Sequence, residues 1–365
     1  MATLEELRIQ ANNVTSSTSV LDMFSIVEQI KAVTNTDVRF LYSNTFVTAN
    51  STNIGHIAYA NNDGLYINDG TQWYALANTY VSTYTFQGSN YGYTSGGATV
   101  NYIQQYSYTS DANATDSGDL TVGRYGPSGQ SSSDYGYTSG GTPSTGTFDK
   151  FPFASGGNAS SVGSLATASY APIGQSSSDN GYVSGGSAPS NVIQKFPFAT
   201  DANATDVGDL TVARYYGAGQ SSSDYGYTSG GNYPGGYSNT IDKFPFSTDA
   251  NASDVGDLST GVGYGVAGQS SSTYGYRTGV YYGSRYNTIE KFPFATDANV
   301  SDVGDLIAVL ASTSGSSSTE YGYTAGGYSP PSVNTIQKFS FSTDGNASDV
   351  ADLVYAVIYT AGQQY

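Results

Sequence analysis

The sequence predicts an all-β fold, a six-bladed β-propeller over residues 83–365, preceded by a small α+β region over residues 1–82. A recurring Gly-Tyr pair predicts the propeller, because repeats of 40 to 50 residues are typical of its blades. Successive pairs are 44 to 49 residues apart and start at Gly92, Gly136, Gly181, Gly226, Gly275 and Gly322. Each repeat also holds four short segments with strand character, which is the strand content of one blade.

The repeat that begins near Ala218 shows the expected strands most clearly. Tyr225, Tyr227 and Ser229 alternate as in a half-buried strand. Gly230 and Gly231 follow, where the backbone needs unusual dihedral angles or close packing. The four strands are expected near residues 215–221, 225–229, 241–246 and 255–258.

The C-terminus predicts how the ring closes. Residues 361–363 read Ala-Gly-Gln and repeat residues 218–220, but the chain ends without the rest of a repeat. A single strand here would complete the first blade and leave no unpaired sheet edge. Residues 84–89 are the competing candidate for this strand. A β-helix is the rival architecture, but it normally uses a shorter period and needs end caps.

The first 82 residues predict two helical segments and a β-rich module. Apolar residues recur at helical spacing in residues 4–11 and again in residues 20–33. Helices of about 15 residues are marginal alone, so the apolar stripe needs a partner: a second copy, another protein, or a small internal core. Residues 55–76 carry two hairpin turns, at 61–64 and 68–70.

Charge and composition exclude several classes of protein. The chain has 12 Lys and Arg against 29 Asp and Glu, a net charge of −17, so we expect no nucleic-acid or anionic-membrane partner. It has no cysteine, which excludes disulfides and thiolate zinc sites. No apolar run reaches the roughly 18 residues of a membrane span. No basic segment precedes an apolar one near residue 1, so we expect assembly in a cytoplasm.

The sequence predicts no catalytic site and no cofactor. His56 is the single histidine, and a lone histidine more often packs or faces solvent than catalyses. A carbohydrate-active enzyme is the alternative, and it would need two carboxylates at a set separation in the central channel. The repeated acidic residues fall in outer turns instead.

Calcium is the metal hypothesis that the repeats raise. Asp201, Asn203, Asp206 and Asp209 place oxygen ligands at alternating positions, as hard-cation loops do. The corresponding segment 156–164 has lost every carboxylate while keeping the turn. We therefore interpret the acids as turn residues, with calcium as the alternative.

Ligand binding is predicted for the loops that follow each Gly-Gly pair, where the repeats differ most: 98–102, 142–147, 187–191, 232–239, 281–287 and 328–334. These loops carry the candidate binding residues Tyr233, Tyr237, Tyr281, Tyr282, Arg285, Tyr286 and Tyr328. Tyrosine among small polar residues is typical of paratopes, and tyrosine rings also stack on sugars. The alternative is that tyrosine merely fills loops in a chain that has 34 of them.

Two resemblances add to this interpretation. The order strand, Gly185-Gly186, variable loop, Phe196, turn, strand and Arg214-Tyr215 resembles the kelch repeat of galactose-oxidase-type propellers. Copper chemistry of that family needs a cysteine and several histidines, which this chain lacks. The Ser/Thr/Asn/Tyr-rich repeats also resemble those of structural proteins of marine bacteriophages, especially cyanophages. The pattern Gly-x-Ile-Ala-Tyr to Asp-Gly-x-x-Trp within residues 55–73 is similar to β modules of phage tail fibres and other virion appendages.

These resemblances imply a non-enzymatic virion protein of the tail-fibre or appendage type. The N-terminal region would anchor to other virion proteins, and the propeller would bind a host-surface receptor or glycan. We also expect a homo-oligomer and no membrane insertion. The alternatives are a capsid or tail decoration protein without a ligand, and a propeller carbohydrate-active enzyme.

Overall fold

The computed structural model describes residues 86–365, apart from 144, 145 and 188, together with four short strands nearer the N-terminus. The chain divides into two compact units, residues 1–83 and residues 84–365. The described residues contain strands and turns but no helix. Within this part of the chain, nothing helical is long and apolar enough to cross a membrane.

The described part of the first unit is one four-stranded sheet. Its strands are β1 (Phe40–Tyr42), β2 (Ile57–Ala60), β3 (Gly64–Asn68) and β4 (Trp73–Ala77), in the order β1-β2-β3-β4. Strands β2, β3 and β4 pair antiparallel, and β1 pairs with β2 in parallel. The expected helical segments, the expected turn residues 61–63 and 69–70, and His56 lie outside the described residues.

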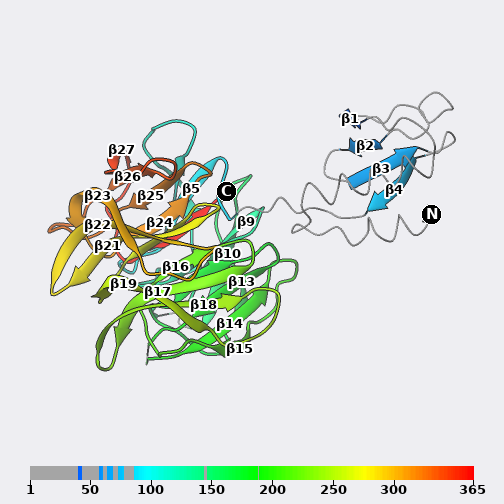
Figure 1. Ribbon diagram of the computed structural model, residues 1–365. Helices are drawn as coiled ribbons and strands as arrows, with labels where there is room; N and C mark the ends of the chain where they lie inside the picture. The colour runs from blue at the N-terminus through cyan, green and yellow to red at the C-terminus, as the bar shows by residue number, and fades with distance from the viewer. Residues whose placement is uncertain are drawn as a thin grey trace. The chain divides into compact units, whose positions relative to one another are not determined.

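The second unit is a six-bladed β-propeller, which confirms the predicted architecture of this region. Figure 1 shows its four-stranded sheets arranged around a common centre. Blades 1 to 3 are β28 (Ala361–Gln364)-β5 (Tyr91–Ser95)-β6 (Tyr102–Ser107)-β7 (Thr115–Asp119), β8 (Ser128–Ser131)-β9 (Tyr135–Ser139)-β10 (Thr147–Pro152)-β11 (Ser160–Ser164), and β12 (Ile173–Ser176)-β13 (Asn180–Ser184)-β14 (Val192–Pro197)-β15 (Thr205–Asp209). Blades 4 to 6 are β16 (Ala218–Ser221)-β17 (Tyr225–Tyr233)-β18 (Gly236–Pro245)-β19 (Ser253–Val262), β20 (Ala267–Ser270)-β21 (Tyr274–Tyr282)-β22 (Ser284–Pro293)-β23 (Ser301–Leu310), and β24 (Ser314–Ser317)-β25 (Tyr321–Ala325)-β26 (Thr335–Ser340)-β27 (Ser348–Asp352).

The C-terminal strand closes the ring. Strand β28 pairs antiparallel with β5, so the last residues of the chain form the inner strand of blade 1. This confirms the closing strand that the Ala-Gly-Gln repeat predicts. The competing segment enters the channel instead: Gly88 donates its N–H to the Ser317 carbonyl, and the Gln87 side chain donates to the Ser270 carbonyl. Phe86 lines the channel cavity.

Glycine at the middle of each inner strand allows the six strands to meet around the channel. A Cβ built on Gly219 would lie 2.0 Å from the Gly174 carbonyl oxygen, far inside any allowed contact. The same clash, at 2.0 to 2.3 Å, links each member of the cycle to the one before it: Gly129, Gly174, Gly219, Gly268, Gly315 and Gly362. We call these residues the glycine ring. Glycine is the only residue without a Cβ, so the close approach of neighbouring inner strands requires glycine at this position in every blade.

Side chains next to the glycine ring join neighbouring blades. The Gln220 amide donates to the carbonyl of Tyr276 in the following blade at 2.9 Å, and Gln175 does the same to Tyr227 at 3.0 Å. Where one repeat has Ser316 in place of this glutamine, the hydroxyl of Tyr106 hydrogen-bonds to that serine at 2.7 Å. In the other blades the residue corresponding to Tyr106 is phenylalanine, so the two substitutions compensate each other.

The two ends of the channel differ. Each inner strand begins at the crossing from the previous blade and ends at the turn to the second strand, so the crossings and the loops between second and third strands share one face. In blades 4 and 5 the segments between the second and third strands form paired β-structure instead of irregular loops. Residues 232–239 and 281–287, expected to be irregular, mostly extend β17–β18 and β21–β22, with Tyr233 paired to Gly236 and Tyr282 paired to Ser284. Glycines 236 and 283, with φ of 142° and 66°, allow the tight reversals that lengthen both hairpins.

Candidate binding face

Backbone hydrogen bonds join successive crossings around most of the channel mouth. Each crossing contains a residue with φ between 52° and 64°: Gly126, Ala171, Tyr216, Gly265, Ser312 and Tyr359. The N–H of Ala171 donates to the Gly126 carbonyl, that of Tyr216 to Ala171, that of Tyr359 to Ser312, and that of Gly126 to Tyr359. The left-handed backbone aims these N–H groups at the preceding crossing, so it fixes where the side chains of the bonded residues project.

Tyr216 and Tyr359 cap the mouth. They occupy opposite positions in the six-membered ring of crossings, yet their rings approach to 5.3 Å between centroids. Tyr125 lies 4.7 Å from Tyr359, and the hydroxyls of Tyr170 and Tyr216 hydrogen-bond to each other. Tyr216 and Tyr359 also line a cavity of about 60 Å³ with Pro127, Pro172 and Val266. The mouth is therefore covered by half-buried aromatic rings whose edges carry hydroxyl groups.

Burial raises the pKa values of these phenols. Desolvation is the main reason why the pKa values of Tyr125, Tyr170 and Tyr216 are raised above the ordinary value of 10.0. For Tyr216 the hydrogen bond with Tyr170 raises the pKa further. Each phenol thus keeps its proton at neutral pH and can both donate and accept hydrogen bonds.

Tyr264 connects the mouth to the long hairpins of blades 4 and 5. Its ring lies 5.3 Å from Tyr216, 5.7 Å from Tyr281 and 6.5 Å from Tyr237. Tyr237 in turn lies 5.4 Å from Tyr282. One continuous aromatic network therefore runs from the mouth onto the hairpins. We call it the tyrosine face: Tyr125, Tyr170, Tyr216, Tyr237, Tyr264, Tyr281, Tyr282 and Tyr359.

Other predicted binding residues border this network. The Arg285 guanidinium lies over the rings of Tyr328, at 4.6 Å, and Tyr281, at 6.0 Å, which places a positive charge at its edge. Tyr233 and Tyr286 lie on the same two hairpins and are 37% and 42% exposed. The structure thus brings together Tyr237, Tyr281, Tyr282, Arg285 and Tyr328, three of them in the aromatic network and two beside it.

The mouth residues Tyr125, Tyr170, Tyr216, Tyr264 and Tyr359 are absent from the predicted site. The sequence contains a signal for them, since tyrosine occurs a few residues before five of the six inner strands, at positions 125, 170, 215–216, 264 and 359. The differences between the repeats predict a binding site only in the loops after each Gly-Gly pair. The crossings share that face only because the meander brings both to the same end of the blade.

The acidic turns, where calcium is the metal hypothesis, lie on the outer part of the blades and hold blades together. The Asp201 carboxylate forms an ion pair with the Lys150 ammonium of the preceding blade at 2.5 Å. Asn203 accepts the N–H of Ser164 at 3.0 Å, and Asp206 accepts the N–H of Gly208 at 3.3 Å. The backbone of Asp209 donates to Asn251 at 3.1 Å. No three acidic or histidine side chains of the described residues gather as a metal ion would need.

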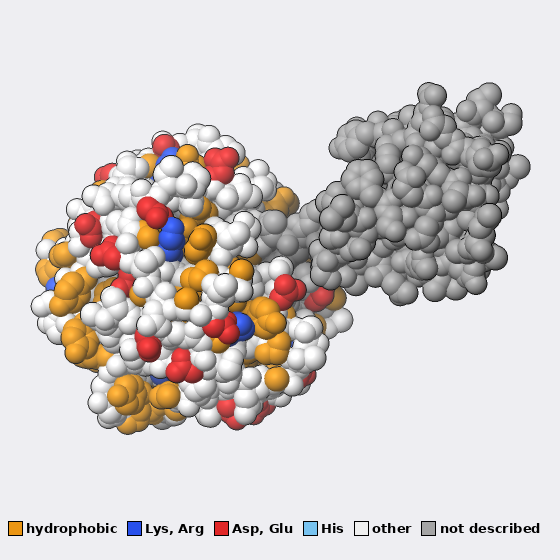
Figure 2. Space-filling view, in the orientation of Figure 1, with side chains coloured by type: hydrophobic (Ala, Val, Ile, Leu, Met, Phe, Trp, Pro, Cys, Tyr) orange, Lys and Arg blue, Asp and Glu red, His pale blue; other side chains and the backbone are white. Residues whose placement is uncertain are grey.

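The loss of one of these acids, the one at Gly156, has a structural reason. Ion pairs like that of Lys150 recur between Lys195 and Asp249, Lys243 and Asp297, Lys291 and Asp344, and Lys338 and Asp111. At the seam between blades 1 and 2 the lysine position holds Gln105 and the acid position holds Gly156. The acid is missing where its lysine is missing, which indicates that these carboxylates serve the seams. Figure 2 shows acidic side chains scattered over one face, with basic side chains beside some of them.

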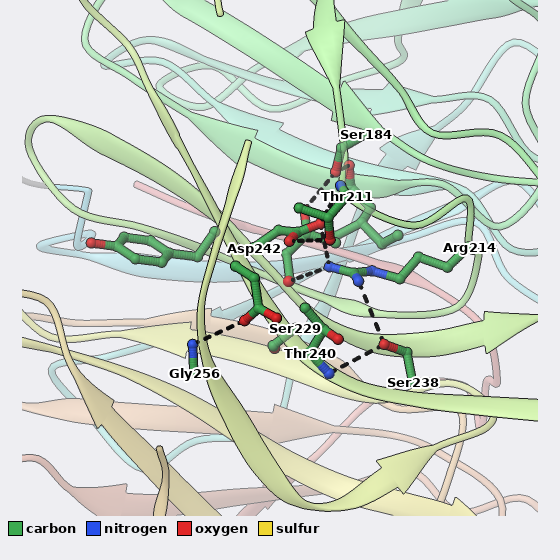
Figure 3. A network of polar contacts seen from close by, with 12 residues as sticks. Ser184, Thr211, Arg214, Ser229, Ser238, Thr240, Asp242 and Gly256 are labelled. Carbon is green, nitrogen blue, oxygen red and sulfur yellow. Dashed lines mark hydrogen bonds and ion pairs between the residues drawn. The ribbon is translucent and has the colours of Figure 1, made fainter. Parts of the chain in front are cut away.

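A second group of acids is buried in ion pairs. The Asp242 carboxylate forms an ion pair with the Arg214 guanidinium at 2.9 Å (Figure 3). Both side chains are fully buried. Thr211 also donates its hydroxyl to this carboxylate, and the arginine donates to the Thr228 carbonyl. Arg124 and Asp149 form the equivalent pair in blade 2, whereas in blade 5 Glu290 pairs with Arg277, which comes from strand β21 and not from the crossing. Desolvation is the main reason why the pKa values of these arginines are lowered.

Glutamine replaces the acid in the blades without such an arginine. Gln194 accepts the N–H of Thr167, Gln337 that of Ile307, and Gln104 that of Tyr355. The described residues lining the two cavities along the channel include no Asp or Glu. These acids therefore act as structural partners of arginine.

No protein-family model matches the chain, and no curated protein matches it.

Proposed function

We propose that this chain is a non-enzymatic binding protein of a virus particle, of the phage tail-fibre or appendage type. In this proposal the tyrosine face of the propeller binds a carbohydrate on the host surface. Support comes from the tyrosine face itself, from the absence of carboxylates among the described lining of the channel, and from the resemblance of the repeats to phage structural proteins.

The observation that carries the proposal is the left-handed backbone at Tyr216 and Tyr359, with φ of 61° and 54°. A residue with a Cβ loses about 1–2 kcal/mol in this conformation, and glycine does not. Two crossings use glycine at the same position, Gly126 and Gly265. Backbone geometry therefore favours glycine at these positions. Residues other than glycine that keep a strained backbone conformation are typical of functional sites.

The chemistry of the face favours a carbohydrate. Its rings offer flat surfaces for the C–H faces of a sugar, and its neutral phenols offer hydrogen bonds to hydroxyl groups. Arg285 at the edge could add a contact to an acidic sugar. Tyrosine also supplies large contact area at low entropic cost, as in paratopes.

The proposal extends to the particle. The N-terminal region would contact other virion proteins and support a homo-oligomer, and the protein would be assembled in the host cytoplasm. A capsid or tail decoration protein is the second candidate, favoured by the tight seams and buried ion pairs that would suit a purely structural role. A carbohydrate-active enzyme has the weakest support, because its carboxylate pair would have to come from outside the described channel lining.

Binding of the full-length chain to an array of bacterial surface polysaccharides tests the proposal. We expect saturable binding that Tyr237→Ala/Tyr282→Ala weakens at least about tenfold, one ring contact being worth about 0.5–1.5 kcal/mol. Tyr135→Ala is the matched control, since Tyr135 is 36% exposed but lies at the start of β9, at the opposite end of the blade. Equal loss in both variants, or no binding to any polysaccharide, would contradict the proposal.

A further inference from the structure

The seam between blades 1 and 2 differs from the other five. At the others a lysine of the third strand reaches an aspartate of the next blade at 2.5 to 2.7 Å. Here Gln105 replaces the lysine and Gly156 replaces the aspartate. Ser117 replaces a valine that the other five blades share: Val162, Val207, Val255, Val303 and Val350. Three side chains are thus shortened together at one seam.

These replacements open a hollow. A cavity of about 480 Å³ is lined by Tyr91, Gln105, Asp116, Ser117, Phe153 and Tyr365, among others. A Cβ on Gly157, which also lines it, would meet nothing within 4 Å. The volume falls within the range of about 300–1,000 Å³ that small-ligand sites occupy.

Aromatic rings, uncharged polar groups and one carboxylate, that of Asp116, line this hollow. Tyr91 is 37% exposed at its edge. The Tyr365 ring stacks on Phe153 at 5.2 Å, and the inner strands of the other blades have serine at the position of Tyr365. Gln105 donates to the Tyr93 hydroxyl at 2.7 Å, which fixes its amide. An aromatic group has therefore been added at the seam where the charged pair was removed.

We propose that this hollow, which we call the seam groove, binds one neutral sugar residue. Losing one lysine and one aspartate leaves the seam's charge balance unchanged, so no charged occupant is needed to restore it. A neutral sugar fits the remaining chemistry: its C–H face stacks on an exposed tyrosine ring, and its hydroxyls bond to Gln105, Ser117 and the Asp116 carboxylate. The groove lies at the end of the blades away from the tyrosine face, so this site is separate from the one proposed above.

Saturation-transfer NMR on the full-length chain tests the seam groove, with methyl glycosides of glucose, galactose, mannose and N-acetylglucosamine at about 10 mM, suited to weak binding. We expect transfer to at least one glycoside. Gln105→Lys/Ser117→Val restores two of the three seam side chains that the other five seams carry, and should abolish that transfer in a protein that still unfolds cooperatively on heating.

The tyrosine-face variant Tyr237→Ala/Tyr282→Ala should leave this transfer unchanged, which separates the seam groove from the proposed function. Transfer that survives Gln105→Lys/Ser117→Val in a folded protein would overturn the inference. So would an absence of transfer from all four glycosides, whatever the polysaccharide array shows.

Discussion

The wall of the channel and its mouth lie within a few residues of each other in every repeat, yet they follow opposite rules. The wall has glycine in all six blades, because any Cβ would overlap a neighbouring carbonyl. At the mouth the equivalent residues are Gly126, Ala171, Tyr216, Gly265, Ser312 and Tyr359, although all share a backbone that favours glycine. Packing dictates the wall, whereas the side chains of the mouth are not explained by the fold.

Gly219→Ala tests the wall and should have the largest effect. The new Cβ would lie 2.0 Å from the Gly174 carbonyl, and the ring of blades leaves neither strand room to move. We expect a loss above about 4 kcal/mol in the free energy of unfolding, measured by urea denaturation. Gly146→Ala is the control, because its nearest neighbour would be an ordinary contact at 3.8 Å, and an equal effect in both would refute the account.

The buried pair of blade 4 offers a test inside the repeats. Asp242→Gln leaves the Arg214 charge buried without its carboxylate, and we expect a loss of about 3 kcal/mol. Adding Arg214→Ser copies blade 3, which has Gln194 and Ser169 at these positions, and should recover most of that loss. Urea denaturation of both variants measures it. A double variant no more stable than Asp242→Gln would contradict the pairing of arginine with acid.

Substitutions at Tyr216 sharpen the comparison at the mouth. Both Tyr216→Ala and Tyr216→Gly remove the ring, but only glycine relieves the φ of 61°. We expect the glycine variant to be more stable than the alanine variant by about 1 kcal/mol, the reverse of the order in an ordinary strand. Thermal unfolding of the two variants measures the difference, and alanine being the more stable would show that the mouth is not strained.

High pH should lower the stability of the protein because of its buried tyrosines. Desolvation raises the pKa values of Tyr182 and Tyr276 to about 12, from an ordinary 10.0. Between these values the unfolded chain loses phenolic protons that the folded chain keeps, so stability is fully present below about pH 10 and falls as pH rises toward 12. Melting temperatures measured from pH 8 to 12 check this. A constant melting temperature across pH 10–12 would contradict the burial of these phenols.

The repeats allowed the number of blades and the closing strand to be predicted, because both follow from a period and from an incomplete last repeat. The glycine pairs likewise predicted the turns in the backbone, as Gly185 and Gly186 have φ of 65° and 108°. The hairpins of blades 4 and 5 were predicted as loops, since tyrosine-rich and glycine-rich segments give no clear alternation. Their pairing depends on reversals at positions 236 and 283.

The candidate site was predicted only in part. Tyr237, Tyr281 and Tyr282 were identified by variability between repeats, but their contact with Tyr264 and the mouth depends on how a crossing meets the next blade. The acids of the outer turns suggested a metal site because their lysine partners cannot be recognised in the sequence. Paired residues such as Lys195 and Asp249 are about 50 residues apart. Such pairing is visible only once adjacent blades are placed together.

The variant Tyr216→Gly/Tyr359→Gly tests most directly whether the tyrosines of the mouth serve binding. Its melting temperature and its affinity for the polysaccharide that the wild-type chain binds would be measured together. We expect a folded protein whose melting temperature stays within about 5 °C of wild type, with affinity lowered at least about tenfold. Unchanged affinity would contradict it, and so would unfolding of the variant, because the rings would then belong to the structure of the propeller.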